Sequence, residues 1–565
     1  MSASRLALLI VICASAAALG FPAAFVAVHG LDPRGWPDLP GTAIAWFSAP
    51  GRNVIDQTSG VVARTIITYA RMIVGRSPAF ADGGQFAVLM IFGAATLLGA
   101  VTVASAKTRI LRHWSSTRFG DARFAGPREL GRMCRGLELG FDPATRRPVR
   151  VQVEGNLLTV APPRRGKTGG LVLPNLAFPD VDAWAGPAVV IDPKGDAFRA
   201  ARRRRAAMGR KVRCIDPLGL AGGTDRWNPL LRRLPDDVLY FQSMAQALLP
   251  PTNHTSEAGA FFRDRAGVVI VASMLAAIRN GHADAIAAAE LVRDYRQLLH
   301  ALQGKDDAVS NDARSILTAD ERTRSEILAT AAQAFSWALD PLMQKVVQAH
   351  TFELRDLCDG DTDLFVVLPA DDRRKIIAPY VRWLLGDLFA AVRERRVAER
   401  ILIFLDEAFV LGAYDAIIAG AGELPGYGVS LWTFWQSEAQ LIETYGAHGA
   451  AILRDTAEVT QIFNLSRASA DECRRWSEAM GTYTGVDETE TRDPGTGRVT
   501  TSRTAAAAPL VHPAAMAAET QRNSIVFLNS PDYTTDPLKL GKTRADRDNR
   551  FSELLDLSPP VGSTT

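Results

Sequence analysis

The sequence predicts an α/β protein whose largely parallel sheet carries a phosphate-binding loop, and three observations support this fold class. Apolar runs rich in β-branched residues alternate with helical stretches after residue 107, which is typical of strands buried on both faces of a parallel sheet. The segment APPRRGKTGG (161–170) follows one such run and contains Gly-Lys-Thr in the order of a phosphate-binding loop. A later run, ILIFL (401–405), is followed by an Asp-Glu pair.

Length and composition limit the class of protein. At 565 residues the chain is too long for one compact core, so several domains are expected. Its 64 basic and 61 acidic residues give a net charge of +3, a balance that by itself implies no nucleic-acid partner. The five cysteines lie far apart without metal-ligand spacing, which favours reduced thiols in a mostly cytosolic body.

Two uncharged runs near the start, 6–28 and 86–106, each reach the ~20 residues that a helix needs to cross a bilayer. Basic residues follow the second run closely, which marks its end as cytoplasmic. We therefore expect residues 1–106 to form a two-span membrane anchor, with a short external segment between the spans and a cytoplasmic body after them. Two alternatives are a cleaved signal peptide, flanked by Arg5, for the first run and a buried core helix for the second.

Eight later runs are predicted to be parallel strands of one sheet. Polar side chains follow four of them, and ligands bind at the carboxyl ends of parallel strands. These polar residues are Asp192, Asp216, Asp406 and Gln436. The predicted strands are 157–160, 188–191, 212–215, 364–368, 401–405, 429–434, 459–463 and 525–528.

The strand pattern is interrupted by a stretch of Ala- and Leu-rich helical texture. We therefore expect a nucleotide-binding domain in two parts with an all-α domain inserted between them. A polar stretch at 485–503 indicates an exposed loop or hairpin, with DPGTG as its turn. The expected divisions are 107–235 and 351–545 for the two parts, 236–350 for the helical insertion and 546–565 for a flexible tail.

The loop at 161–170 predicts the phosphate end of a nucleotide site. Backbone N–H groups of such a loop point into one concavity, and the helix that follows adds its positive end. Lys167 would reach the β- and γ-phosphates, and the Thr168 hydroxyl would bind Mg²⁺. Ala161 stands where the usual pattern has glycine, which alanine can replace if its φ stays below zero. The predicted nucleotide-binding residues are Ala161, Pro162, Pro163, Arg164, Arg165, Gly166, Lys167, Thr168 and Gly169.

The Asp-Glu pair after 401–405 supplies the second half of a P-loop ATPase site, with ATP and Mg²⁺ as its ligands. Asp406 would bind Mg²⁺ together with Thr168, and Glu407 would polarise the attacking water. Gln436 follows the next strand and would sense the γ-phosphate or orient that water. Lys167, Glu407 and Gln436 are thus the predicted catalytic residues. Each feature alone has an ordinary explanation, such as a basic turn or an acidic helix start, but their order along the chain favours the nucleotide site.

Several longer segments resemble the type IV secretion coupling proteins, the TraG/TraD-like group within the FtsK–HerA translocase superfamily. Besides the loop segment and the two spans, the resemblance rests on five stretches that together extend to about residue 545. They are GDARFA (120–125), VVIDPKGD (189–196), FFRDRAGVVIVASML (261–275), FLDEAFVLG (404–412) and WQSEAQLIETYG (435–446).

The resemblance implies a RecA-like P-loop NTPase domain with an all-α insertion, in a homo-hexamer that hydrolyses ATP between subunits. It also implies that the anchor lies in the bacterial inner membrane, so that the short external segment is periplasmic. Such a protein recruits a relaxase–DNA complex or protein effectors, contacts DNA without sequence preference and feeds its cargo into a type IV secretion channel. It also implies a role near the nucleotide for Asp192 and Lys194. Two alternatives remain: a membrane-anchored DNA translocase of the same superfamily, and a substrate receptor with an impaired ATPase.

One departure from the family concerns the arginine that a neighbouring subunit may offer to the nucleotide. The segment where the family often carries it reads GELPGYG (422–428), without arginine. Arg454 or Arg467 could substitute, although a structural or surface role is the more common explanation for each.

The basic stretch 199–213 could contact nucleic acid, but a solvated helix is favoured. Trp432 and Trp435 are expected in the core rather than on a base-stacking platform.

Overall fold

The structure is a computed structural model that describes residues 119–250, 257–492 and 499–557. Both predicted membrane spans lie outside these residues. Within the described ranges, no helix is long and apolar enough to cross a membrane. The four described cysteines are free thiols.

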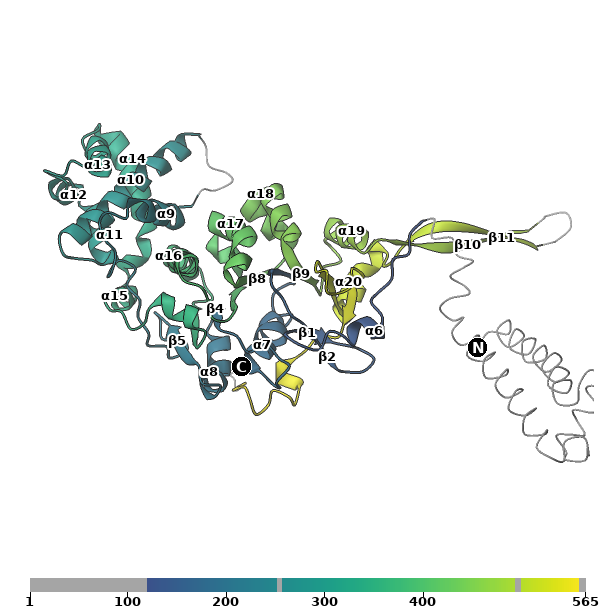
Figure 1. Cartoon of the computed structure of the whole chain (residues 1–565). Helices are drawn as coiled ribbons and strands as arrows, with labels where there is room; N and C mark the ends of the chain where they lie inside the picture. Colours follow the sequence, from purple (N-terminus) through teal and green to yellow (C-terminus); the bar gives the residue numbers. More distant parts are fainter. Residues whose placement is uncertain (1–118, 251–256, 493–498, 558–565) are drawn as a thin grey trace, which may run out of the picture. The chain divides into compact units, whose positions relative to one another are not determined.

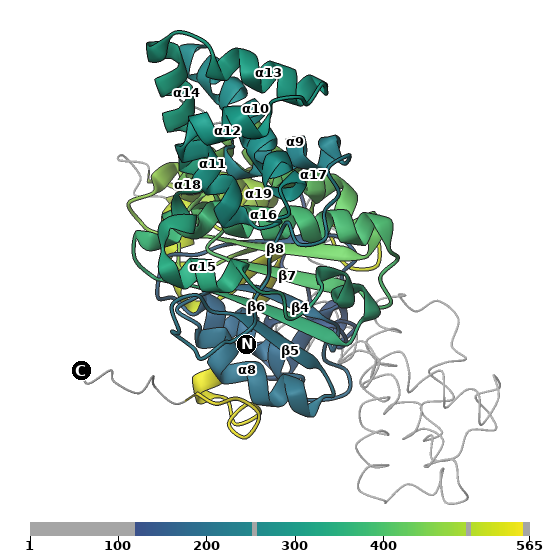
Figure 2. The same cartoon turned by 90° about the vertical axis from the view of Figure 1, so that its left-hand side faces the viewer.

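A nine-stranded sheet organises the described part of the chain, and all eight predicted strands belong to it. Figure 2 shows five of them, β8, β7, β4, β6 and β5, side by side in that order. In spatial order the strands are β13 (Leu538–Leu540), β12 (Ser524–Leu528), β9 (Ala457–Ile462), β3 (Asn156–Val160), β8 (Val429–Trp435), β7 (Ile401–Asp406), β4 (Ala188–Pro193), β6 (Thr362–Leu368) and β5 (Lys211–Ile215).

Seven of these strands run parallel, from β9 to β5. The prediction that 525–528 is also parallel is wrong, because β12 pairs antiparallel with β9 and β13 antiparallel with β12. The preceding helix α20 (Pro513–Arg522) explains the reversal. The N–H of Asn464, just past the end of β9, donates to the Thr520 carbonyl at 2.8 Å, so α20 ends at the carboxyl edge of the sheet. With one residue between α20 and β12, the strand can only run back.

Helices cover both faces of the sheet. On one face lie α7 (Leu173–Ala177) and α8 (Asp196–Ala207), whose apolar side chains pack with β4 and β6. On the other face lies the long helix α16 (Arg373–Glu394). The remaining helices of this part are α6 (Pro127–Leu130), α17 (Asp415–Glu423), α18 (Glu438–Asp455) and α19 (Ala470–Ala479).

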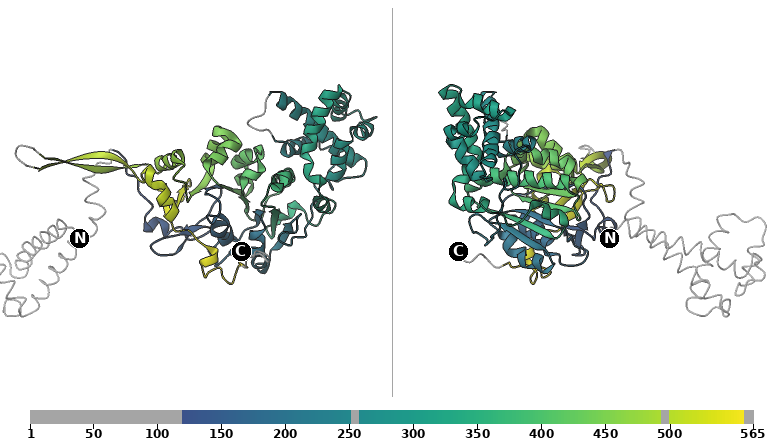
Figure 3. Two further views of the ribbon diagram at one scale, coloured as in Figure 1. Left: turned by 180° about the vertical axis from the view of Figure 1, so that it is seen from behind. Right: turned by 60° about the vertical axis from the view of Figure 1, so that its left-hand side comes forward.

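The chain between β5 and β6 is helical, as the sequence pattern predicts. These helices gather beside α16 in Figures 1 and 3, where α9 packs on α16 and α10 packs on α9, α11, α13 and α14. The domain boundaries at 235 and 350 remain predictions. The helices are α9 (Val238–Leu248), α10 (Glu257–Arg279), α11 (Ala285–Arg293), α12 (Tyr295–Ala301), α13 (Ala308–Leu317), α14 (Glu321–Ala334) and α15 (Pro341–Val347).

Two further sheets of two strands each occur in the described part of the chain. β1 (Leu137–Phe141) and β2 (Pro148–Val151) pair antiparallel and were not predicted from the sequence. β10 (Thr482–Arg492) and β11 (Val499–Pro509) pair with each other, which confirms the two strands of the hairpin that was one of the two structures expected at 485–503. The predicted turn DPGTG (493–497) lies outside the described residues. Residues 484–507 fall outside the compact unit that contains the large sheet.

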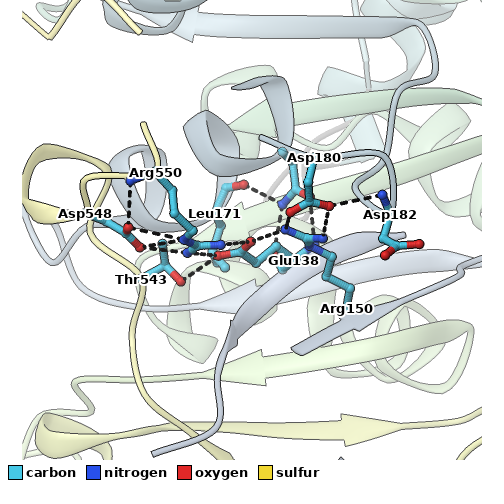
Figure 4. A network of polar contacts seen from close by, with 9 residues as sticks. Glu138, Arg150, Leu171, Asp180, Asp182, Thr543, Asp548 and Arg550 are labelled. Carbon is cyan, nitrogen blue, oxygen red and sulfur yellow. Dashed lines mark hydrogen bonds and ion pairs between the residues drawn. The ribbon is translucent and has the colours of Figure 1, made fainter. Parts of the chain in front are cut away.

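The expectation of a flexible tail from residue 546 is wrong for its first half. Phe551 and Leu555 are buried in the core under the sheet. Arg550 forms an ion pair with Glu138 of β1 at 2.8 Å. Figure 4 shows this pair within a larger network of polar contacts. Apolar and ionic contacts therefore fix residues 546–557, and residues 558–565 lie outside the described part.

The basic stretch 199–213 also differs from its expected solvated state at one position. Arg205, on the sheet-facing side of α8, is completely buried and forms an ion pair with Asp363 at 2.7 Å. Arg202 and Arg203 are exposed, as expected for a solvated helix. Trp432 and Trp435 are fully buried, which confirms that they belong to the core.

Candidate nucleotide site

The loop at 161–167 joins β3 to a helix that begins at Thr168 with one π-helical turn (Thr168–Val172) and continues as α7. Two of its residues have a positive φ: Arg164 at 58° and Gly166 at 91°. Ala161 is not among the described residues with positive φ. Its N–H donates to the Trp435 carbonyl at 2.9 Å, which extends the pairing of β3 with β8. Alanine therefore suits this position, because the loop needs left-handed backbone at Arg164 and Gly166 instead.

Lys167 and Thr168 point toward the carboxyl end of the sheet. The buried Lys167 ammonium donates to the carbonyls of Ala161 at 2.8 Å and Pro162 at 3.2 Å. Burial lowers the pKa of Lys167, and the nearby carboxylates of Asp406 and Glu407 oppose that shift. The Thr168 hydroxyl donates to Asp406. Two halves of the predicted site, 238 residues apart in sequence, thus meet through one hydrogen bond.

Asp406 and Glu407 occupy the end of β7. Burial raises the pKa of the Asp406 carboxyl, although the hydrogen bond from Thr168 counteracts the shift. Glu407 has φ 103°, a left-handed conformation that costs a non-glycine residue about 1–3 kcal/mol. Its side chain accepts from the Gln436 amide at 3.1 Å and forms an ion pair with Arg374. The predicted catalytic acid is therefore held from two sides on a strained backbone.

A cavity of about 890 Å³ runs along these groups. From the predicted loop, Pro163 to Gly169 line it, together with Asp406, Glu407 and Gln436. Ala161 and Pro162 do not line the cavity; they lie behind it and accept hydrogen bonds from Lys167. Within the described ranges, His, Cys, Asp and Glu form no group of three or more that could hold a metal ion. Thr168 and Asp406 therefore fit Mg²⁺ only if phosphate oxygens and water complete its shell, as is usual for this ion.

The other two carboxylates at strand ends, Asp192 and Asp216, accept hydrogen bonds from the backbone of the segments that follow them. Asp192 accepts from the Phe198 N–H at 2.8 Å and so holds the first turn of α8. Asp216 accepts from the N–H groups of Leu220 and Ala221. Burial raises the pKa of Asp192 to about 7. Lys194, with φ 75°, does line the cavity, so of the two family-implied positions only Lys194 reaches the site directly.

Arg374 is the site residue that the sequence reasoning missed. It lies in the first turn of α16, a few residues after the end of β6, and reaches the carboxylate of Glu407. The run of basic residues just past a strand end (Arg373, Arg374, Lys375) was the available signal. Arg454 and Arg467 were suggested for a different role, as the arginine that one subunit offers to its neighbour. Arg454 forms an ion pair with Glu438, Arg467 is exposed, and neither lines the cavity of its own chain. Their role toward a neighbouring subunit stays a prediction.

A strand, a glycine-containing loop and a helix, with Lys and Thr facing an acid on a nearby strand, define the class of P-loop nucleotide-binding α/β proteins. Residues 150–555 match the family described as Type IV secretory system Conjugative DNA transfer, and the chain belongs to that family. The family resemblance drawn from the sequence is therefore confirmed.

Curated relatives agree with this assignment. The chain is 27% identical over 368 residues to a conjugal transfer protein TraG of Escherichia coli, covering 59% of this chain and 56% of that protein. It is 25% identical over 342 residues to protein VirD4 of Rhizobium radiobacter, covering 58% and 48%. The chain thus spans about half the length of the curated relatives it matches.

Solved structures share the fold. The plasmid coupling protein TrwB in complex with the ATP analogue ADPNP superposes with a TM-score of 0.55 at 18% identity, covering 77% of this chain and 99% of that one. TrwB in complex with ADP and Mg²⁺ gives a TM-score of 0.53, covering 77% and 97%. These likenesses confirm the α/β P-loop NTPase fold.

Proposed function

We propose that this chain is an ATPase coupling protein of conjugation or type IV secretion. It binds ATP with Mg²⁺ in the cavity and uses hydrolysis to pass a relaxase–DNA complex or a protein effector into the secretion channel. One observation carries the proposal: Lys167, Thr168, Asp406, Glu407 and Gln436 converge on one cavity from three strands of the sheet. TrwB, which shares the fold, has been solved with an ATP analogue and with ADP and Mg²⁺.

The residues divide the chemistry between them. Lys167 would exchange its two carbonyl partners for phosphate oxygens, and Thr168 and Asp406 are the residues that would hold Mg²⁺. When bound, Mg²⁺ would neutralise charge on the phosphates. Glu407 takes a proton from the attacking water, and Gln436 keeps the carboxylate of Glu407 aimed. Arg374 balances the charge of Glu407 until the nucleotide enters.

The cellular setting is part of the same proposal. The two apolar runs anchor the chain in the bacterial inner membrane, and the cytoplasmic body assembles as a homo-hexamer that contacts DNA without sequence preference. The names of the relatives, conjugal transfer proteins and a type IV secretion system-coupling protein, support a place in such a secretion apparatus. The anchor rests on the two apolar runs, and the hexamer and the DNA contact rest on the family resemblance. Fractionation of membranes and the mass of the detergent-solubilised protein test the anchor and the hexamer.

The decisive experiment measures ATP hydrolysis by the full chain with and without DNA. We expect hydrolysis in the unmodified protein and a loss of at least about 100-fold in Lys167→Ala. Lys211→Ala, at an exposed lysine on β5, serves as the matched control. Normal hydrolysis by Lys167→Ala would refute the proposed site. No hydrolysis by the unmodified protein would favour a substrate receptor with an impaired ATPase. To separate coupling from DNA translocation alone, cargo is crosslinked to the protein in cells and identified.

A further inference from the structure

The cavity has a second end, on the other side of the phosphate loop from the acids. Strand β3, which carries the loop, lies between β8 and β9. Glu407, Gln436 and Arg374 line the cavity on the β8 side. On the β9 side it is lined by residues that follow β9 (Phe463, Asn464), the end of α20 (Gln521) and the segment Lys542–Asp546 after β13. The triphosphate and its metal need only the first side and the loop.

We propose that the segment Lys542–Asp546 is the wall against which the nucleoside part of the bound nucleotide lies. This inference rests on the proposed function, because it assumes that ATP binds in the cavity. It assigns the nucleoside of ATP to the end of the cavity on the β9 side. Nothing in the sequence pattern marks this segment as part of the site, since it follows the loop by more than 370 residues (542 − 168 = 374).

The lining of this end suits a base and a sugar better than phosphate. Leu139 and Phe463 offer apolar surface, and Asn464, Gln521 and Thr543 offer neutral polar groups. Pockets for uncharged heteroaromatic groups combine apolar walls with a few placed polar atoms.

The charged groups of the segment Lys542–Asp546 already have partners within the protein. The Lys542 ammonium donates all three protons, to the Asn464 side chain at 2.8 Å and to the carbonyls of Thr520 at 2.9 Å and Gln521 at 2.7 Å. Arg544 and Asp546 pair with each other at 2.7 Å. The wall therefore presents little free charge to its ligand.

A buried carboxylate fixes the wall in place. Glu138 on β1 is 2% exposed, and its Oε1 accepts from the Thr543 hydroxyl at 3.0 Å. Arg550 grips the same carboxylate with two nitrogens, at 2.8 and 2.9 Å, and also pairs with Asp548. Figure 4 shows these groups drawn together, with Arg150 on the far side of Glu138. Without Arg550, the buried carboxylate of Glu138 would lose most of its charge compensation, and its hold on Thr543 would weaken.

The wall also touches the start of the loop's helix. A Cβ added at Gly170 would meet the Thr543 carbonyl oxygen at 2.7 Å, closer than real Cβ atoms approach. The glycine thus allows the wall to sit directly on the first turn after the phosphate loop, so that one ligand can contact both.

The test compares two probes that share a triphosphate and differ in the nucleoside. Binding of ATP and of inorganic tripolyphosphate, each with Mg²⁺, is measured by calorimetry on the full chain. In Arg550→Met we expect ATP affinity to fall about tenfold while tripolyphosphate affinity changes less than about twofold. In the milder Thr543→Val, ATP affinity falls about threefold. Arg547→Met, at a largely exposed arginine directly after the wall segment, leaves both affinities unchanged.

The outcomes separate this inference from the proposed function. Equal losses for both probes, or no loss of ATP affinity in either variant, overturn the nucleoside wall but leave an ATP site in place. If the unmodified protein binds neither probe, the proposed function and the wall fail together. Circular dichroism checks the fold of each variant, and if Arg550→Met does not fold, Thr543→Val decides.

Discussion

Two arginine–carboxylate pairs at the same sheet differ in their burial, in their hydrogen bonds and in their access to the cavity. Arg205 and Asp363 are both 0% exposed and bond through two nitrogens, at 2.7 and 2.8 Å. Each side chain makes a further bond inside the protein: Asp363 accepts from the Ala188 N–H at 2.9 Å, and Arg205 donates to the Gly186 carbonyl at 2.6 Å. Nη1 of Arg205 is buried without a partner among the described residues. Arg374 and Glu407 are 24% and 22% exposed, face the cavity and involve a carboxylate on a left-handed backbone.

The difference shows what each pair is for. The buried pair ties α8 to β6 and β4, and its bonds leave neither side chain free to move. The pair at the cavity holds its acid by one arginine and one amide, on a backbone conformation that persists only because its surroundings impose it. An acid held in this way can exchange partners when a nucleotide enters.

Breaking the buried pair should have the largest effect. Arg205→Met leaves Asp363 charged and buried, so we expect the free energy of unfolding to fall by about 3–5 kcal/mol. Urea denaturation measures it. Arg203→Met, at an exposed arginine of the same helix, should stay within about 0.5 kcal/mol of the unmodified protein. A similar small change in Arg205→Met would show that the buried pair is dispensable.

Asp192 sharpens the comparison, because it is a buried carboxylate to which no arginine of the described residues is paired. Its pKa is raised from 3.8 to about 7 by burial. Between about pH 4 and 7 the folded chain therefore keeps a proton that the unfolded chain has lost, and this group's contribution to stability falls as the pH rises. In Asp192→Asn that loss is absent. The free energy of unfolding of the variant should therefore rise relative to that of the unmodified protein by up to about 4 kcal/mol from pH 4 to 8. Urea denaturation across this range measures the gain, and a constant difference would contradict the raised pKa.

Glu407→Gln tests the pair at the cavity. The amide keeps the shape and a hydrogen bond to Gln436 but cannot accept a proton, so we expect ATP hydrolysis to fall by at least about 100-fold, or about 2.7 kcal/mol. ATP binding, measured by calorimetry, should change less than about threefold. Glu423→Gln, at an exposed glutamate, is the matched control. Unchanged hydrolysis in Glu407→Gln would remove Glu407 from the catalytic role.

The smallest effect is expected when Arg374 is replaced. An ion pair that water still reaches contributes little to stability, so Arg374→Gln should lower the free energy of unfolding by less than about 1 kcal/mol. Urea denaturation measures this free energy, with Arg373→Gln, at an exposed arginine, as the matched control. A loss comparable to that of Arg205→Met would erase the distinction between the two pairs.

The sequence predicts the strands well and the contacts between distant segments poorly. Strands buried on both faces are continuous apolar runs, so β3 to β9 could be located without a structure. β1 was missed because its run LELGF contains Glu138, whose buried charge is explained only by Arg150 and Arg550. The direction of β12 depends on where α20 ends, which no local pattern records.

The residues of the site also fall into those that the sequence predicts and those that only the fold reveals. The loop and Asp406 follow strand ends and were found, and the structure joins them through Thr168. Arg374 reaches Glu407 from the helix after another strand, β6, so its role appears only when the order of strands in the sheet is known. Thr543 and the rest of the segment 542–546 have no local signature, because they contribute through their position.

The bond between Thr543 and Glu138 spans 405 residues, and it sets an order of events during synthesis. A chain grows from its N-terminus, so the loop and its lysine leave the ribosome long before the segment that closes the cavity. A growing chain therefore carries an unenclosed phosphate loop for most of its translation. The completed pocket first exists when residues 542–550 have emerged and folded back onto β1.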